Sequence, residues 1–134
     1  MIYLAIPYTG QEELSYHVAT HIAAELSRRG EVVFSPITHS HPFTRIVDLP
    51  GDWGFWGKID REFIERADEM WIVMLDGWKE STGIKAEQII AKANGVPIHT
   101  LNVYHGKSGS FIISRHEVWK PIIVPAMEVA QCEV

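Results

Sequence analysis

The chain has little of what marks secreted, membrane-bound or nucleic-acid-binding proteins. Its single cysteine, Cys132, excludes an intramolecular disulfide framework and fits a reducing compartment. No window approaches the roughly 20 apolar residues that a membrane helix needs, and the N-terminus has no basic start. The net charge is -5, and the basic residues form no cluster beyond Arg28 and Arg29. We therefore expect a cytoplasmic protein with no membrane or nucleic-acid partner.

What is present describes one compact domain. The 134 residues are 46% hydrophobic and 22% charged, which is enough for a modest core. Apolar runs of strand type alternate with segments of helical period, a pattern typical of βα units. The sequence therefore predicts an α/β fold over residues 1–134: a three-layer, doubly wound domain with a mainly parallel sheet of about five strands, flavodoxin-like or Rossmann-like.

The elements can be placed along the chain. Strands are predicted at residues 2–6, 32–34, 70–75 and 98–101, and helices at 12–29, 55–67 and 83–93. Gly30 stands where a helix C-cap is expected. Residues 36–51 read as a long irregular segment, and such segments in small domains are usually functional. After residue 102 the signal weakens to short apolar runs at 111–113 and 122–124, and the last ten residues are expected to fray.

In an open parallel sheet, ligands bind beyond the carboxyl ends of the strands. Pro7, Tyr8, Thr9 and Gly10 follow the first predicted strand and lead into a helix, where free N–H groups favour a phosphate or carboxylate. The segment is neither a G-x-G-x-x-G nor a P-loop sequence, and an ordinary βα turn explains it equally well.

Two histidines, His39 and His41, follow the second predicted strand. No Asp, Glu, Cys or third His accompanies them at the usual ligand spacing, so they predict hydrogen bonds to a substrate in preference to a metal site. We expect no metal and no cofactor.

Two carboxylates stand out near the third predicted strand and its neighbouring helices. Ser81 is placed to cap the helix that contains Glu87, and capping and ligand contact are both open for it. Glu87 lies four residues after Gly83, so its simplest role is to balance the helix dipole. Asp60 has Trp56 at i-4 and Ile64 at i+4, and an unpaired carboxylate on so apolar a face would be costly. Asp60 is therefore a candidate for a buried role.

Several segments together carry a resemblance to a known superfamily. They are Ile2-Tyr3-Leu4-Ala5 with Pro7-Tyr8, Phe34-Ser35-Pro36-Ile37 with His39-Ser40-His41-Pro42, Asp60, Ala67-Asp68, and Ser81-Thr82-Gly83-Ile84-Lys85-Ala86-Glu87. This series resembles the nucleoside 2-deoxyribosyltransferase-like superfamily. Within it, the segment Leu75-Asp76-Gly77-Trp78 is most similar to the DUF1937 family of bacteria and phages. The resemblance runs from residue 2 to about residue 101.

The resemblance implies chemistry at the C1′ carbon of a nucleoside or nucleotide. A glutamate, here Glu87, attacks the anomeric carbon and forms a glycosyl ester that water or another base then takes. An aspartate, here Asp60, orients the nucleophile or helps to protonate the leaving base. The tyrosine of the first strand matches Tyr3, with Tyr8 as an alternative. An apolar group of Trp53, Phe55 and Trp56 is expected to hold the base by stacking.

The residue six positions before the nucleophile divides the superfamily. Transferases resemble one another in having aspartate there, whereas the nucleotide hydrolases, which are 2′-deoxynucleoside 5′-monophosphate N-glycosidases, have serine. This chain has Ser81, which favours a nucleotide hydrolase whose phosphate is held by the first loop and Ser81. Lys85 replaces the glycine that the family has two residues before the glutamate, and lysine could neutralise a phosphate or block the usual pocket.

Other functions remain open. The runner-up is a nucleoside 2-deoxyribosyltransferase that exchanges bases. A non-catalytic nucleotide sensor and a protein-interaction domain that uses its tryptophans are further alternatives. The expected partner is a small nucleoside or nucleotide, and the related enzymes imply a homodimer or higher homo-oligomer. The substrate-binding candidates are Pro7, Tyr8, Thr9, His39, His41, Trp56, Ser81, Gly83 and Lys85.

Overall fold

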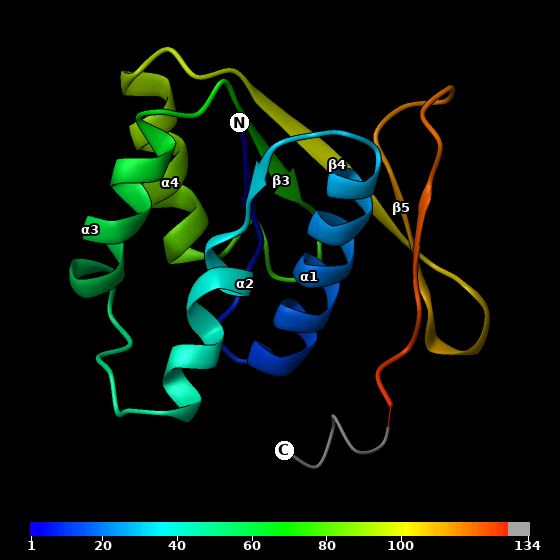
Figure 1. The fold of residues 1–134 in the computed structure, drawn as a ribbon, viewed down its shortest axis with the longest axis horizontal. Coiled ribbons are helices and arrows are strands. Elements are labelled where there is room, and N and C mark those ends of the chain that lie inside the picture. The colour runs from blue at the N-terminus through cyan, green and yellow to red at the C-terminus, as the bar shows by residue number, and fades with distance from the viewer. Residues whose placement is uncertain (129–134) are drawn as a thin grey trace.

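Six strands form one sheet in the computed structural model, which describes residues 1–128 (Figure 1). They are β1 (Ile2–Ala5), β2 (Val33–Phe34), β3 (Glu69–Val73), β4 (Ile98–His105), β5 (Phe111–Ser114) and β6 (Ile122–Val124). The order is β2-β1-β3-β4-β5-β6, with parallel pairing as far as β4 and antiparallel pairing beyond it. The α/β fold is confirmed, with six strands where about five were predicted. Cys132 and the end of the tail lie outside the described residues.

Three long helices accompany the sheet: α1 (Glu12–Arg28), α3 (Trp53–Ile64) and α4 (Thr82–Ala93). Each matches a helix predicted from apolar spacing, although α3 starts two residues earlier than expected and ends three earlier. Asp52 explains the early start, because its side chain accepts a hydrogen bond from the Phe55 N–H and caps the helix. Gly30, with φ +94°, follows α1 in the left-handed conformation expected of a residue at that end.

The prediction of an irregular segment at residues 36–51 is partly wrong. Its first ten residues form α2 (Pro36–Ser40) and the 3₁₀ helix η1 (His41–Arg45). The Ser35 hydroxyl accepts from the Thr38 N–H, and Pro36 occupies the first helical turn, where its missing N–H has no cost. The strand before it is also shorter and less buried than predicted, since Val32 lies outside β2 and is exposed.

The sheet separates two apolar clusters, and this separation positions the site. Ile2 and Leu4 of β1 point toward α1, whereas Tyr3 and Ala5 point to the opposite face, because neighbouring residues of a strand alternate. Ile64 of α3 belongs to the second cluster, as do Ile84 and Ile90 of α4. Figure 1 shows α3 and α4 together on one side, away from α1 and the β5–β6 hairpin. The odd-numbered residues of β1 therefore face the α3–α4 layer.

The chain changes direction across the sheet at β1. Both β2 and β3 pair with β1, so the connections from β1 lead to opposite sides, and this is the switch point where open α/β sheets bind ligands. The loops after β1 and β3 are tied together, since the Gln11 side chain donates to the Asp76 carbonyl oxygen at 2.6 Å.

None of the helices within residues 1–128 has the length and apolar character required to cross a membrane.

Candidate active site

A tyrosine and a glutamate that are 84 residues apart in the sequence meet under the α3–α4 layer. Tyr3 is fully buried in β1, and its hydroxyl donates a short hydrogen bond to the Glu87 Oε2 of α4. Glu87 is only 5% exposed. It lies in the second turn of α4 and faces the sheet, so its role is not that of a surface carboxylate that merely balances the dipole.

Asp60 of α3 completes the cluster. Its side chain is 8% exposed, in agreement with the buried role predicted from its apolar neighbours. The Tyr3 hydroxyl interacts with the Asp60 carboxyl as well as with Glu87. Tyr3, Asp60 and Glu87 therefore form one buried acidic group, hereafter the Tyr3–Asp60–Glu87 cluster, built from a strand and two helices.

Burial shifts the proton affinities of all three groups. Removal from water raises the pKa of Glu87 to about 8; the Tyr3 hydrogen bond opposes this shift, and the charge of Asp60 adds to it. Burial raises the pKa of Asp60 to about 6, although the Tyr3 contact lowers it. The pKa of Tyr3 is raised well above its usual value, first by burial and then by the two carboxyls. Burial therefore raises the pKa of both carboxyls, and that of Glu87 further than that of Asp60.

Aromatic rings lie beside this cluster. The Tyr3 ring is 6.0 Å from that of Phe34, and Phe34 stacks on Phe63 with ring centroids 3.6 Å apart. His39 lies against the same pair, 5.5 Å from Phe34 and 6.4 Å from Phe63. A predicted ligand residue, His39, is therefore connected to the cluster through rings, and its Nδ1 is 3.0 Å from the Ser40 hydroxyl.

Phe34 and Phe63 were not among the predicted site residues. Two signals point to them in the sequence: Phe34 ends β2, where ligands are expected, and Phe63 is three residues after Asp60 on α3. Trp56 was predicted to stack on a base, but its indole N–H donates to the Pro50 carbonyl and its ring meets Phe55. Trp53 and Trp78, rather than Trp56, pack against the apolar cluster that contains Tyr3.

The loop after β1 is occupied by contacts within the protein. The Gly10 N–H donates to the Glu12 carboxylate at 2.5 Å, and the Gln11 N–H donates to the Tyr8 carbonyl. Both Glu12 and Glu13 lie in the first turn of α1. Two carboxylates at this helix end oppose the binding of a phosphate there, so the loop around Pro7 and Thr9 is a weaker anion site than its position suggests.

His41, the second histidine predicted to contact a substrate, is buried in a hydrogen-bonded chain. Its Nδ1 is 2.5 Å from the Tyr8 hydroxyl, and its Nε2 is 3.0 Å from Glu13 Oε1. Arg45 donates to the other Glu13 oxygen at 2.8 Å. Both ring nitrogens therefore have partners within the protein, and neither is left for a direct hydrogen bond to a ligand.

The start of α4 differs in charge from the start of α1. Ser81 caps the helix by accepting from the Ile84 N–H at 3.2 Å, so of the two roles left open for it, capping is confirmed. Thr82 and Gly83 supply the first N–H groups of the helix, and its first turn has no acidic residue. Lys85 is exposed, and its side chain therefore does not fill the buried space around Glu87. An anion is better accommodated here than at α1.

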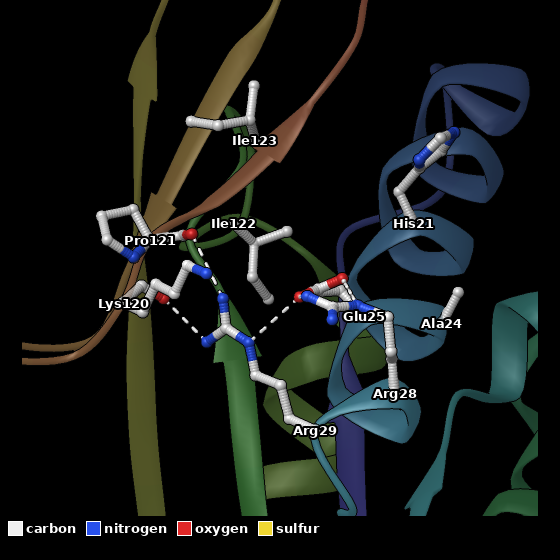
Figure 2. Close-up of a pocket in the computed structure, with 9 residues that line it drawn as sticks. All are labelled: His21, Ala24, Glu25, Arg28, Arg29, Lys120, Pro121, Ile122 and Ile123. Carbon is white, nitrogen blue, oxygen red and sulfur yellow. Dashed lines mark hydrogen bonds and ion pairs between the residues drawn. The ribbon is translucent and has the colours of Figure 1, made fainter.

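A pocket of about 370 Å³ lies on the opposite face of the sheet from the cluster. It is lined by His21, Ala24, Glu25, Arg28, Arg29, Lys120, Pro121, Ile122 and Ile123 (Figure 2). Arg29 donates to Glu25 and to the carbonyl oxygens of Lys120 and Pro121. These bonds join the end of α1 to the segment before β6, so Arg29 has a structural role in this pocket.

The comparison with protein families adds one finding. Residues 1–103 match the family described as a domain of unknown function, DUF1937. The chain belongs to the DUF1937 family. The matched range includes all three residues of the Tyr3–Asp60–Glu87 cluster, whereas β5 and β6 lie beyond it. A search of curated proteins found no match for this chain.

Proposed function

We propose that this DUF1937 protein hydrolyses the N-glycosidic bond of a nucleoside 5′-monophosphate, and that the superfamily relationship to the nucleoside 2-deoxyribosyltransferases holds. The observation that carries the proposal is the buried Tyr3–Asp60–Glu87 cluster at the switch point of the sheet. Buried carboxyls with pKa values raised to different extents are the arrangement that acid–base and nucleophilic chemistry needs.

The proton held by the cluster is the one that the leaving base needs in the first step. A neutral Glu87 forms an ester with C1′ and loses its proton, while the C1′–N bond breaks and the base leaves with the bonding electron pair. The leaving nitrogen needs one proton, and Glu87 has one to give. Asp60, ionised above about pH 6, accepts it through the Tyr3–Asp60–Glu87 cluster and passes it to the base. Water then attacks C1′ of the ester and Asp60 takes one proton of that water, while the bond from C1′ to the Glu87 oxygen breaks and Glu87 leaves as a carboxylate. The proton on Asp60 then returns to Glu87 and restores the starting state.

The anionic end of the substrate is assigned to the start of α4. The N–H groups of Thr82 and Gly83 head a helix without acidic residues in its first turn, and Lys85 adds a positive charge. Ser81 stands six residues before Glu87, where the resemblance associates serine with nucleotide hydrolases. The phosphate and the reacting carbon would then both lie along α4.

A nucleotide sensor is the competing function that a specific observation favours. A buried, neutral glutamic acid that is hydrogen-bonded to a tyrosine also serves as a fixed structural group, with no need to ionise. A sensor binds its nucleotide about equally well after Glu87→Gln, which keeps the shape of the side chain. An enzyme retains binding in this variant and loses turnover.

The decisive experiment measures base release by chromatography. Wild type, Glu87→Gln and Glu87→Ala are incubated with a panel of nucleosides and 5′-monophosphates, with and without an added free base. Exposed Glu80, seven residues earlier, provides a matched control as Glu80→Gln. Release from monophosphates by wild type and by the control alone supports the hydrolase, and base exchange on nucleosides supports the transferase. No release from any substrate contradicts both enzymes.

A further inference from the structure

A chain of hydrogen bonds joins Tyr8, His41 and Glu13 at the crevice end of the sheet. Tyr8 comes from the loop after β1, His41 begins η1, and Glu13 lies in the first turn of α1. His41 is 5% exposed, and the Tyr16 ring covers it with centroids 4.7 Å apart. Three separate segments therefore converge on one buried imidazole, which connects the helical segment α2–η1 to the loop after β1.

The partners of His41 determine where the protons lie. A carboxylate can only accept, so the Nε2 atom at 3.0 Å from Glu13 carries the hydrogen. Arg45 already supplies the positive charge that balances Glu13, at 2.8 Å from its other oxygen. In a neutral ring the remaining nitrogen, Nδ1, is then an acceptor, and the Tyr8 hydroxyl, 2.5 Å away, is its donor.

The protonation of the Tyr8 phenol agrees with a hydrogen bond that Tyr8 donates to His41. Burial raises the pKa of Tyr8, and the charges of Glu12 and Glu13 raise it further, whereas Thr44 and Arg45 act against them. The phenol therefore keeps its proton at neutral pH. When that proton is donated to His41, the Tyr8 oxygen has only lone pairs left for a ligand. The Thr44 hydroxyl also contacts Tyr8, but its own proton goes to the His41 carbonyl oxygen, so it does not use these lone pairs as a donor.

We propose that Glu13 and His41 are positioning residues that fix Tyr8 as a hydrogen-bond acceptor, so that Tyr8 selects ligands by a sugar hydroxyl. An acceptor repels a phosphate oxygen and binds a hydroxyl that donates. The two carboxylates at the start of α1 also repel a phosphate and accept from a hydroxyl. The hydrogen bond from Gln11 to Asp76 keeps this loop beside the loop after β3. The identity of the ligand as a nucleotide rests on the proposed function.

The first test examines the protein without ligand. Nitrogen-15 NMR of the imidazole distinguishes the Nε2–H form of His41 from the Nδ1–H form and from the doubly protonated ring. We expect the Nε2–H form in the wild type and a mixture in Glu13→Gln, whose amide no longer requires a donor. A wild-type ring with its proton on Nδ1, or with two protons, overturns the proposal whatever the enzyme does.

The second test measures binding of four adenosine 5′-monophosphates: the ribo, 2′-deoxy, 3′-deoxy and 2′,3′-dideoxy forms. Loss of the selected hydroxyl is expected to weaken wild-type binding by about 3- to 10-fold, the usual effect of one hydrogen bond. Tyr8→Phe should erase that ratio, and Glu13→Gln should reduce it. Tyr16→Phe is the matched control, because it removes a phenol hydroxyl and keeps the ring that contacts His41 and the Arg45 guanidinium, and it should keep the ratio.

The outcomes separate this inference from the proposed function. Hydroxyl discrimination that disappears in Tyr8→Phe, in a protein that releases no base, supports the inference and contradicts the hydrolase. Base release together with an unchanged ratio in Tyr8→Phe supports the hydrolase and contradicts the inference. If none of the four adenosine nucleotides binds, the inference is overturned, and absence of binding across the whole panel of nucleosides and 5′-monophosphates overturns both.

Discussion

Two carboxyl groups with separated pKa values make the chemistry of the cluster depend on pH at the scale of single residues. Asp60 must be ionised to accept a proton and Glu87 must hold one to give, so both conditions are met between the pKa values of about 6 and about 8. Below this window Asp60 is protonated, and above it the leaving base has no proton to receive. The rate should therefore rise with pH on the acidic side of this window and fall with pH on the basic side.

We accordingly predict a bell-shaped dependence of kcat/KM on pH with limbs near 6 and 8. Asp60→Asn removes the acceptor and should lower kcat/KM by about 100-fold or more, with loss of the acidic limb. The measurement is a series of initial rates from pH 5 to 9 on the best monophosphate. A profile that rises continuously with pH would show that ionised Glu87 is the active form, contrary to the proton assignment.

The raised pKa of Glu87 also predicts that the stability of the fold depends on pH. A group whose pKa is raised by folding binds more protons in the folded state, so its contribution is favourable at low pH and is lost as the pH rises through the folded value. Glu87→Gln removes this dependence while it keeps an acceptor for Tyr3. As the pH rises from 5 to 8, the wild type should lose free energy of unfolding relative to this variant, by roughly 3 kcal/mol. Denaturant unfolding at both pH values measures it, and an equal difference at both would contradict it.

At the scale of elements, α3 depends on a glycine that no periodicity reveals. Gly57 is buried, and a Cβ built on it would lie 2.7 Å from the Trp53 ring one turn earlier. The indole therefore approaches the Gly57 backbone closely, and it packs against the apolar cluster that contains Tyr3. Glycine is normally unfavourable inside a helix, so the reason for it here is the close approach of Trp53.

Gly57→Ala should accordingly destabilise the protein by about 1–3 kcal/mol through overpacking, despite the better helix propensity of alanine. Gly54→Ala in the same helix is the control, because its new Cβ would meet only the Asp52 carboxylate at 3.8 Å. That control should leave the midpoint of thermal unfolding unchanged or raise it. Equal effects of the two variants would mean that Trp53 moves freely.

The elements also show what the sequence could predict. Apolar spacing placed α1, α3 and α4, and the apolar face around Asp60 correctly indicated burial. Periodicity could not show α2 and η1, because ten residues divided between two short helices display no repeat, although Ser35-Pro36 is a helix start signal. Nor could it show that His41 contacts Tyr8 and Glu13, since that contact depends on how three segments pack.

At the scale of the whole molecule, the resemblance predicts a homo-oligomer, and the surface has apolar residues available for one. The most exposed large apolar side chains include Val32, Ile46, Ile89, Val118 and Ile123. We predict a mass above the 15.2 kDa monomer at micromolar concentration, measured by light scattering during size-exclusion chromatography. A mass of one chain across that range would contradict the prediction.

The strands beyond the family match are integrated into the core on the α1 face. Trp119 lies 6.2 Å from Trp71 of β3, and the Arg29 guanidinium lies 4.9 Å from the Trp119 ring. Arg29 also binds the two carbonyl oxygens that follow Trp119 (Figure 2). The β5–β6 hairpin is thereby joined to the parallel part of the sheet and to α1, on the face opposite to the Tyr3–Asp60–Glu87 cluster.

Trp119→Ala should therefore lower stability without changing the chemistry. The ring is half-buried, so its loss should cost about 2–3 kcal/mol, somewhat less than that of a fully buried tryptophan. Its neighbour Val118 is 90% exposed, and Val118→Ala should stay within about 0.5 kcal/mol of wild type. Base release per folded molecule, measured well below the unfolding midpoint, should be equal in both variants because the hairpin and the cluster lie on different faces. A loss of turnover in Trp119→Ala at full folding would show instead that the strands beyond residue 103 help to shape the site.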